Sequence, residues 1–556
     1  MKDFFSRMIL SASGWRAVFA ADGDENSMRP DLSKAGELIC TAVAMSFASN
    51  FGLKKGDRIL LASDSRPTGK ALCSVVYRTL EHLGLKVCYA GICSAPETMA
   101  ESSYGSYQAF FYISASHNPA GHNGFKFGRD GGVFSKADIT PAIEMMKVLA
   151  GKEEEVEKVW NECRGADPEP DKELKRQSLE HYTDFIIRTT CPDGNTDELR
   201  AQIKKCSIGI CADLNGSARS VSVDKDFLSY MGFKTVFVND RAGEIVHGII
   251  PEGKNLDTCR KLLEEMHAKD PDFVLGYVPD NDGDRGNIVC IDNSGKAVIL
   301  EAQEVFALSV MSTLSYHKSI GTKNLAVAIN GPTSMRIDRI AQSMGAKTFR
   351  AEVGEANAVS LADSLREKGY SVPILGEGSN GGNITYPARV RDPINTLMAL
   401  TRLLVNGQTI PRAIENLPAF VTTNATEERA ILRLKTSDYR TLKAEYEKAL
   451  PGCFEARKQE LATYGIRSWK EFQTEGIVER CESGNGDKGG LKISFYNSDE
   501  TCIAYIWMRP SGTEPLFRIL ADVDASVKDA MKLHDLLIQW QRDMVLKAQE
   551  KVLKTS

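Results

Sequence analysis

The sequence predicts an α/β fold made of several parallel strand–helix units. Short apolar runs at residues 109–113, 273–278 and 371–375 have the composition of strands buried on both faces of a sheet. Segments with helical spacing of apolar residues, at 75–84 and 302–314, alternate with these runs, which is typical of parallel α/β units. Because 556 residues are too many for one hydrophobic core, we expect three to four domains.

A loop that contains a serine follows the first of these runs. Residues 114–126 read SASHNPAGHNGFK, which places Ser116 just beyond the carboxyl end of the strand, where ligands bind in open α/β sheets. The turn-forming residues of the loop would allow Lys126 to return toward the serine and neutralise a phosphate. We interpret Ser116 as a nucleophile that carries a phosphoryl group. The alternative is an ordinary polar loop between a strand and a helix.

Three aspartates at alternate positions follow the second run: Asp280, Asp282 and Asp284. Such carboxylates can converge on a hard cation such as Mg²⁺, which prefers oxygen ligands and often shares them with a phosphate. The loop is not an EF-hand, because the positions that require Gly and Glu there hold Arg285 and Ile291. A solvated acidic turn is the remaining alternative to a metal site.

Two further loops carry groups that can bind a sugar phosphate. Residues 376–382 read GEGSNGG, but the segment after them is a poor helix start, which argues against a dinucleotide fingerprint. We expect Glu377 and Ser379 of this loop to contact sugar hydroxyls. Residues 509–515 read RPSGTEP and combine a guanidinium, two hydroxyls and backbone amides, the ingredients of a phosphate-binding nest. A plain turn is the alternative for this last loop.

In this order, the four loops resemble those of the α-D-phosphohexomutase family, which includes phosphoglucomutases and phosphomannomutases. The resemblance covers nearly the whole chain, and weaker matches at residues 13–16, 64–69 and 213–216 support it. It implies three similar mixed α/β/α domains and a smaller C-terminal α+β domain around a central cleft. We expect a phosphoserine domain at 1–180, a metal-binding domain at 181–295, a sugar-recognition domain at 296–410, and a phosphate-binding domain at 411–556 with an insertion around 438–487.

The resemblance also implies a reaction. Phosphorylated Ser116 would pass its phosphoryl group to a hexose 1- or 6-phosphate of glucose or mannose, and would recover the other phosphate from a bound hexose 1,6-bisphosphate. Mg²⁺ is then the expected metal, and a hexose 1,6-bisphosphate is the expected activator. Two alternatives stay open: a hexose 1,6-bisphosphate synthase or phosphatase that uses the same phosphoserine, and a non-catalytic sugar-phosphate sensor.

The site residues implied by the resemblance fall into three groups, those around the serine, the metal ligands and the substrate-binding residues. Many family members have a histidine in the sugar loop where this chain has Gly381, which affects sugar identity more than reaction type. Glu355 could contact a sugar hydroxyl or stabilise a helix expected to begin at Ala356. The catalytic group is Ser116, Lys126, Arg16, Arg285 and, in a supporting role, His117; the metal ligands are Ser116, Asp280, Asp282 and Asp284; the substrate group is Glu377, Ser379, Gly354, Glu355, Arg509, Ser511, Gly512 and Thr513.

Composition agrees with a cytoplasmic enzyme. A net charge of −5, without a cluster of Lys or Arg, gives no basic surface for nucleic acid, and no apolar run has the length of a membrane span. Thirteen cysteines without a CxxC pair favour reduced thiols over disulfides or a zinc site. Residues 1–21 mimic a secretion signal, but Gly14 and Arg16 interrupt the apolar part. We therefore expect small-molecule hexose phosphates as partners and a monomer or homodimer.

Overall fold

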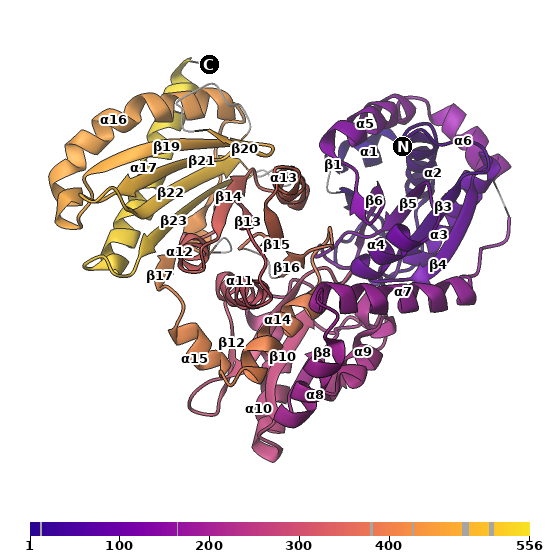
Figure 1. Ribbon diagram of the computed structural model, residues 1–556. Coiled ribbons are helices and arrows are strands. Elements are labelled where there is room, and N and C mark those ends of the chain that lie inside the picture. The colour runs from indigo at the N-terminus through magenta and orange to yellow at the C-terminus, as the bar shows by residue number, and fades with distance from the viewer. Residues whose placement is uncertain are drawn as a thin grey trace. The chain divides into compact units, whose positions relative to one another are not determined.

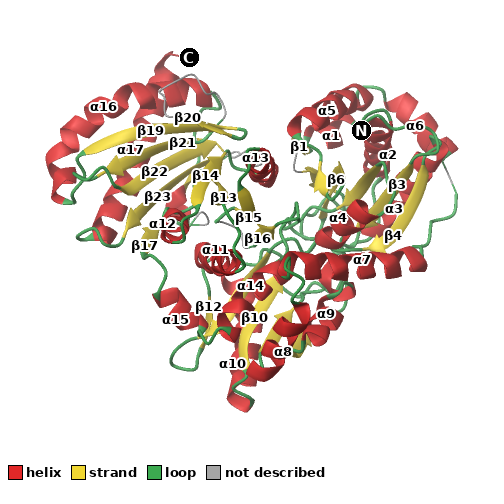
Figure 2. Cartoon of the chain, viewed as in Figure 1, coloured by secondary structure: helices red, strands yellow, loops and turns green. Residues whose placement is uncertain are grey.

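The computed structural model describes residues 1–11, 14–163, 165–378, 382–424, 427–480, 489–510 and 516–555. Within these ranges the chain forms four β-sheets with helices packed against them (Figures 1 and 2). The predicted α/β class is therefore confirmed. The chain divides into two compact units: the first contains Met1–Val305 and Asn380–Ala413, and the second contains Phe306–Ser379 and Ile414–Ser556. The four-domain boundaries stay a prediction.

The first sheet belongs to the first unit and mixes parallel with antiparallel strands. Its order is β1-β2-β6-β5-β3-β4, with β7 beside β6. Strands β3, β4 and β5 run parallel, so their carboxyl ends lie at one edge of the sheet. The strands are β1 (Ile9–Ser11), β2 (Gly14–Val18), β3 (Arg58–Ser63), β4 (Lys86–Ile92), β5 (Ala109–Ile113), β6 (His122–Arg129) and β7 (Gly132–Val133). The helices are α1 (Lys2–Ser6), α2 (Lys34–Ala48), α3 (Gly69–His82), α4 (Ala95–Tyr104), α5 (Lys136–Ala150), α6 (Glu153–Glu162) and α7 (Lys172–Thr190).

Aromatic packing anchors the two strands that flank the serine loop. Phe111 on β5 and Phe127 on β6 make an edge-to-face contact with ring centroids 4.9 Å apart, and Phe47 of α2 lies 5.1 Å from Phe111 in the same geometry. All three side chains are buried. Aromatic pairs of this kind add to the free energy gained from burial alone, so the two strands hold the ends of the serine loop firmly.

The second sheet also belongs to the first unit, and its order is β12-β11-β10-β8-β9. Strands β10, β8 and β9 are parallel, whereas β10 and β11 form an antiparallel hairpin that carries the aspartate loop. The elements are α8 (Thr196–Cys206), β8 (Gly209–Asp213), α9 (Asp224–Met231), β9 (Lys234–Val238), α10 (Asp257–Lys269), β10 (Phe273–Pro279), β11 (Gly286–Ile291) and β12 (Ala297–Ile299). The first unit also contains β16 (Asn383–Thr385) and α14 (Pro393–Val405).

The third sheet contains the parallel strands β14, β13 and β15 of the second unit. The polar loops that follow β13, β14 and β15 therefore leave the sheet at one edge. The strands are β13 (Leu325–Asn330), β14 (Lys347–Ala351) and β15 (Ser371–Gly376), and the helices are α11 (Ala302–Ser319), α12 (Arg336–Ser343) and α13 (Glu355–Glu367).

The fourth sheet is antiparallel, in the order β17-β23-β22-β21-β19-β20 with β18 beside β23. The segment 438–487, which we expected to be an insertion, supplies α16, β19 and β20, and α16 buries Leu442, Tyr446, Leu450 and Phe454 in the core of this sheet. The segment is thus integral to the fold of the second unit. The elements are α15 (Ile410–Glu415), β17 (Phe420–Thr422), β18 (Ile431–Leu432), α16 (Tyr439–Thr463), β19 (Ser468–Glu475), β20 (Val478–Arg480), β21 (Leu491–Tyr496), β22 (Cys502–Pro510), β23 (Phe517–Asp524) and α17 (Ala530–Thr555).

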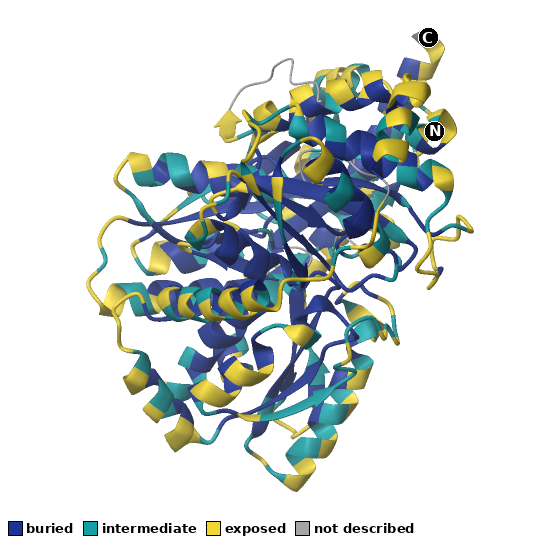
Figure 3. Cartoon of the chain, turned by 90° about the vertical axis from the view of Figure 1, so that its right-hand side faces the viewer, coloured by how far each residue is buried: buried dark blue, intermediate teal, exposed yellow. Residues whose placement is uncertain are grey.

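Burial follows the amphipathic pattern of the helices. The strands are largely buried, whereas many helices carry buried residues on one side and exposed residues on the other (Figure 3). Among the described residues, no helix is both long enough and apolar enough to cross a membrane.

Candidate active site

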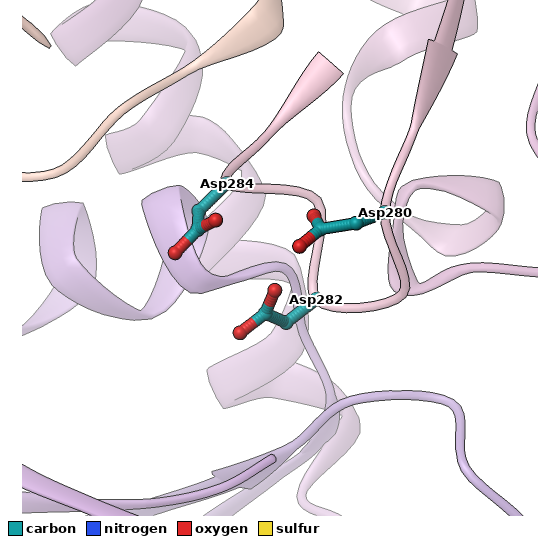
Figure 4. Close-up of side chains that lie close together, drawn as sticks. All are labelled: Asp280, Asp282 and Asp284. Carbon is teal, nitrogen blue, oxygen red and sulfur yellow. The ribbon is translucent and has the colours of Figure 1, made fainter. Parts of the chain in front are cut away.

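The three aspartates predicted to bind a metal do converge. Asp280, Asp282 and Asp284 lie in the loop between β10 and β11 and point toward one another (Figure 4). One carboxylate oxygen from each lies within 4.8 Å of the other two, and all three residues are buried. The loop closes on itself, because the Asp280 amide donates to the Arg285 carbonyl at 3.0 Å and the Arg285 amide donates to Asp280 Oδ1 at 3.1 Å.

Contacts from other elements fix the backbone of this aspartate loop. The Ala95 amide, at the start of α4, donates to the Asp282 carbonyl at 2.8 Å, and the Ala218 amide donates to the Asn281 carbonyl at 2.9 Å. The fully buried Arg219 donates to the Gly283 carbonyl at 3.4 Å. A Cβ on Gly283 would lie only 2.3 Å from Arg219 Cδ, and Gly283 adopts a φ of +69°, so only glycine fits. The loop is therefore held in place before any ligand arrives.

Ser116 lies against the aspartates, as predicted. Its Oγ donates to Asp280 Oδ2 at 3.1 Å, and only 2% of the residue is exposed. Ser114 Oγ accepts from the Ser116 amide at 2.8 Å and donates to Asp282 Oδ2 at 2.9 Å. Ser116 has a φ of +55°, a left-handed conformation that is uncommon for a residue other than glycine. The loop thus places this hydroxyl among carboxylates at some cost in backbone strain.

Lys126 returns to the same cluster on strand β6. Its Nζ lies 2.6 Å from Asp282 Oδ2 and 3.5 Å from Asp284 Oδ2. Burial lowers the pKa of Lys126, but the two carboxylates outweigh that effect and leave the pKa above its ordinary value. Lys126 is therefore a fixed positive charge in this site.

The charge balance of the aspartates fits a divalent cation. Burial and the charges of Asp282 and Asp284 raise the pKa of Asp280 well above its ordinary value. Asp282 Oδ1 is buried and accepts no hydrogen bond from the described residues. A buried acceptor without a donor costs free energy, and a hard cation with a preference for carboxylate oxygens would satisfy it. The residues present therefore fit a Mg²⁺ ion.

Positive side chains also act on the residues around Ser116. Arg16 on β2 is 9% exposed, and its buried Nε has no hydrogen-bond partner among the described residues. Burial and the neighbouring Arg285 lower the pKa of Arg16. The charge of Arg285, burial and the charge of Arg16 lower the pKa of His117 to about 2. Because the charge of Arg285 lowers the pKa of both Arg16 and His117, an anion at Ser116 would be favourable here.

Two arginines near Ser116 were not among the predicted site residues. Arg391 NH2 lies 3.4 Å from Asp284 Oδ1. Arg66 is 3% exposed; its NH2 donates to the carbonyls of Ser116 and Asn118, both at 2.6 Å, and its NH1 donates to the carbonyls of Pro119 and His122. Its Nε donates to Asp64 Oδ2 at 3.1 Å. The Arg66 guanidinium thus binds four backbone carbonyls of the loop that contains Ser116 and stabilises the conformation of that loop.

The predicted sugar-binding residues lie in the second unit. Glu377 Oε1 accepts from Asn330 Nδ2 and from the Gly354 amide, both at 2.8 Å, so the structure brings Glu377 and Gly354 together. Thr333 Oγ1 accepts from the Gly378 amide at 3.0 Å, and sequence reasoning missed both Asn330 and Thr333. Helix α13 begins at Glu355, one residue earlier than expected.

Arg509, the predicted phosphate ligand, lies one residue before the end of strand β22 in the second unit. It pairs with Glu352, with 3.0 Å between its Nε and Glu352 Oε1. The remaining predicted residues lie outside the described residues, so their placement is not stated. They are Ser379, Gly381, Ser511, Gly512 and Thr513.

Comparisons with known proteins find sequences similar to this chain. A family model described as phosphoglucomutase/phosphomannomutase, alpha/beta/alpha domain I, matches residues 12–148. A probable phosphoglucosamine mutase from Methanopyrus kandleri is 24% identical over 526 residues, which cover 93% of this chain and 97% of that protein. A phosphoglucomutase/phosphomannomutase from Thermococcus kodakarensis is 26% identical over 396 residues, which cover 69% of this chain and 78% of that protein.

Among solved structures, a phosphoglucomutase/phosphomannomutase family protein from Burkholderia thailandensis shares the fold of this chain. The two align with a TM-score of 0.65 and 16% sequence identity, over 99% of this chain and 98% of the other. The similarity therefore extends over the whole length of both proteins.

Proposed function

Because the chain belongs to the α-D-phosphohexomutase superfamily, we propose that this phosphohexose mutase interconverts the 1- and 6-phosphates of glucose and mannose through phosphorylated Ser116. The general class, a phosphotransferase of the isomerase type, follows from similar proteins that are named mutases. The sugar and the chemical steps are the substance of the proposal.

One observation carries the proposal: Ser116 Oγ lies against the aspartate cluster, and the charges of nearby arginines act on the residue next to it. Its hydroxyl donates to Asp280 at 3.1 Å, and the charges of Arg16 and Arg285 act on the adjacent His117. In phosphoryl transfer, charge spreads over the oxygens of the moving group, so catalysis depends mainly on positioning and electrostatic stabilisation. The burial of Ser116 and the charges around it therefore favour a serine that carries a phosphoryl group over an ordinary solvated polar loop.

The metal would be held by Asp280, Asp282 and Asp284 together with an oxygen of phosphorylated Ser116. When bound, Mg²⁺ would offset negative charge on the phosphoryl group. Lys126 pairs with Asp282 at 2.6 Å and so holds that carboxylate in place. Arg16 and Arg285 would bind the phosphoryl oxygens.

In the second unit, Glu377 and Arg509 would hold the sugar phosphate. Asn330 and the Gly354 amide bind Glu377 Oε1, which orients the carboxylate toward a sugar hydroxyl. Arg509, with Ser511, Gly512 and Thr513, would hold the phosphate that is not transferred, while Ser379 and Glu355 would contact the sugar. A hexose 1,6-bisphosphate would form as the intermediate and serve as the activator.

Glucose and mannose are proposed because the glycine-rich loop at 376–382 has few bulky side chains that could discriminate between them. Relatives named for glucosamine and relatives named for glucose and mannose both match this chain, so the assay must compare all three sugars. The cysteines of the described residues are free thiols, which supports a reducing compartment such as the cytoplasm.

A coupled assay tests the proposal. The protein is incubated with Mg²⁺, a trace of glucose 1,6-bisphosphate and, separately, the 1-phosphate of glucose, mannose or glucosamine. We expect turnover of the first two sugars that disappears in Ser116→Ala and persists in Ser49→Ala, an exposed serine at the end of α2. Equal or faster turnover of glucosamine 1-phosphate would overturn the sugar assignment. Release of free bisphosphate would indicate a synthase instead, and release of inorganic phosphate would indicate a phosphatase.

A further inference from the structure

Glu352, the residue that follows strand β14, accepts hydrogen bonds from three donors and forms an ion pair with Arg509. Its Oε1 lies 2.9 Å from the Val353 amide and 3.0 Å from Arg509 Nε. Its Oε2 accepts from Thr474 Oγ1 at 2.6 Å and from the Gly490 amide at 2.7 Å. One carboxylate therefore joins the end of β14 to strand β19, to the start of β21 and to the end of β22.

The surroundings of Glu352 use both oxygens of its carboxylate as acceptors. Its side chain is only 10% exposed, and both of its oxygens face donors. A glutamine of the same shape would turn an NH₂ group toward the donors at one oxygen, which would leave at least one backbone N–H without an acceptor. Glutamine therefore cannot replace Glu352 without loss of a hydrogen bond.

The backbone around Glu352 is shaped to admit it. A Cβ on Gly489 would lie 1.7 Å from the Thr474 carbonyl oxygen and 3.0 Å from Glu352 Oε2, and a Cβ on Gly490 would lie 2.5 Å from Trp507 Nε1. The Glu352 amide also donates to the Gly476 carbonyl at 2.8 Å. The two glycines allow the chain to pass close enough for the Gly490 amide to reach the carboxylate.

We propose that Glu352 is a positioning residue that aims the Arg509 guanidinium at the phosphate that is not transferred. The inference rests on the proposed function, in which Arg509 binds that phosphate. Glu352 contacts the Arg509 guanidinium at Nε, the nitrogen attached to the side-chain stem. This contact restricts rotation of the guanidinium. Ordering a long side chain before binding removes an entropic cost that the ligand would otherwise bear.

The same carboxylate links phosphate binding to sugar binding. Glu352 accepts from the Val353 amide, and the next amide, that of Gly354, donates to Glu377. A continuous path of hydrogen bonds and one ion pair therefore runs from Arg509 to Glu377 through two consecutive residues. Glu352 would hold the phosphate-binding and sugar-binding groups at a set spacing.

A double-mutant cycle tests this role by measuring binding rather than turnover. Glucose 6-phosphate is titrated calorimetrically into Ser116→Ala protein, which cannot transfer a phosphoryl group, with Glu352→Gln, Arg509→Met or both added. We expect Glu352→Gln to weaken binding about tenfold, equivalent to about 1.4 kcal/mol, and to have little further effect once Arg509 is methionine. In proteins that retain Ser116, Glu352→Gln should raise KM and leave kcat nearly unchanged.

Controls separate this role from a general structural one. Glu460→Gln removes an exposed glutamate of the second unit that pairs with Arg457 at 2.7 Å, and it should not change binding. Thermal unfolding checks that each variant folds. If Glu352→Gln does not fold, Arg509→Lys provides the test instead. Lysine keeps the positive charge, but it lacks the planar guanidinium, which can contact Glu352 with one edge and the phosphate with the other. Arg509→Lys should therefore bind glucose 6-phosphate as weakly as Arg509→Met.

Two outcomes would overturn the inference. One is that Glu352→Gln weakens the binding of glucose 6-phosphate equally in protein that retains Arg509 and in Arg509→Met protein. The other is that Arg509→Lys binds glucose 6-phosphate with unchanged affinity. Failure of the proposed function looks different: Arg509→Met would then bind glucose 6-phosphate as tightly as the unmodified site.

Discussion

Replacing Arg66 by lysine tests how far the serine loop depends on one buried guanidinium. Arg66 donates to five acceptors, the carbonyls of Ser116, Asn118, Pro119 and His122 and the Asp64 carboxylate. Lysine keeps the positive charge but has three donors, so at least two of these five acceptors lose their donor.

The size of the effect follows from that count. A hydrogen bond to a charged group contributes about 1.5–3 kcal/mol, so Arg66→Lys removes about 3–6 kcal/mol from the stabilisation of the loop. Ser116 holds a strained φ of +55°, and without these bonds the loop would relax and move its hydroxyl away from Asp280. A displacement of about 1 Å at a reacting group can cost about a hundredfold in rate. We therefore expect kcat to fall about a hundredfold.

The assay is a single-turnover measurement of Ser116 phosphorylation by glucose 1,6-bisphosphate, followed by mass spectrometry, beside steady-state kcat and KM. KM should change little, because the predicted sugar-binding residues lie in the second unit. Arg176→Lys is the matched control, since Arg176 is an exposed, ion-paired arginine of the same unit. Full phosphorylation rate and full kcat in Arg66→Lys would refute the reasoning.

Three further predictions concern the charges of the two units. Asp282→Asn should weaken Mg²⁺ binding, measured by calorimetry, by more than the roughly 10–100-fold typical of residues outside the ligand shell; unchanged affinity would place the metal elsewhere. With its pKa lowered to about 2 by Arg285, burial and Arg16, His117 should stay neutral, so its ring resonances in the unphosphorylated protein should not shift between pH 8 and 5; a midpoint near 6.5 would contradict this. Burial and Glu471 raise the pKa of Glu447 from 4.5 to about 7, so only the unfolded state ionises between these values and stability falls as pH rises through this window. Glu447→Gln should therefore unfold at a higher temperature than the parent at pH 8 and at the same temperature at pH 4, and equal midpoints at pH 8 would contradict this.

The association of the serine with the aspartates was predictable because both follow apolar strands. β5 and β10 have the continuous apolar composition of buried strands, and each polar loop leaves a strand at its carboxyl end. The residue spacing of the aspartates was enough to predict their convergence, since alternate positions in a tight loop can turn to one side. These parts of the site depend on local sequence.

The arginines that organise the site could not be predicted in the same way. Arg66 lies 50 residues from Ser116, and Arg219 lies 64 residues from Gly283. Their importance comes from burial and from backbone carbonyls, neither of which is visible in residue identity. The motif at 64–69 gave the only signal for Arg66, and nothing in the local sequence distinguished Arg219 from a surface arginine.

Segment 438–487 carries a signal for core packing that the sequence analysis did not use. Leu442, Tyr446, Leu450 and Phe454 recur every four residues and form the buried stripe of α16. An apolar stripe at this spacing is typical of a helix packed against a core.

The most direct test of the central claim is to follow the phosphoryl group of Ser116 itself. The protein is labelled with glucose 1,6-bisphosphate carrying radioactive phosphate, freed of ligand, and mixed with glucose 1-phosphate in a single turnover with Mg²⁺. The account predicts that label leaves Ser116 and appears in hexose phosphate at least as fast as kcat. Absence of label at Ser116, or its release as inorganic phosphate before it reaches the sugar, would contradict the account.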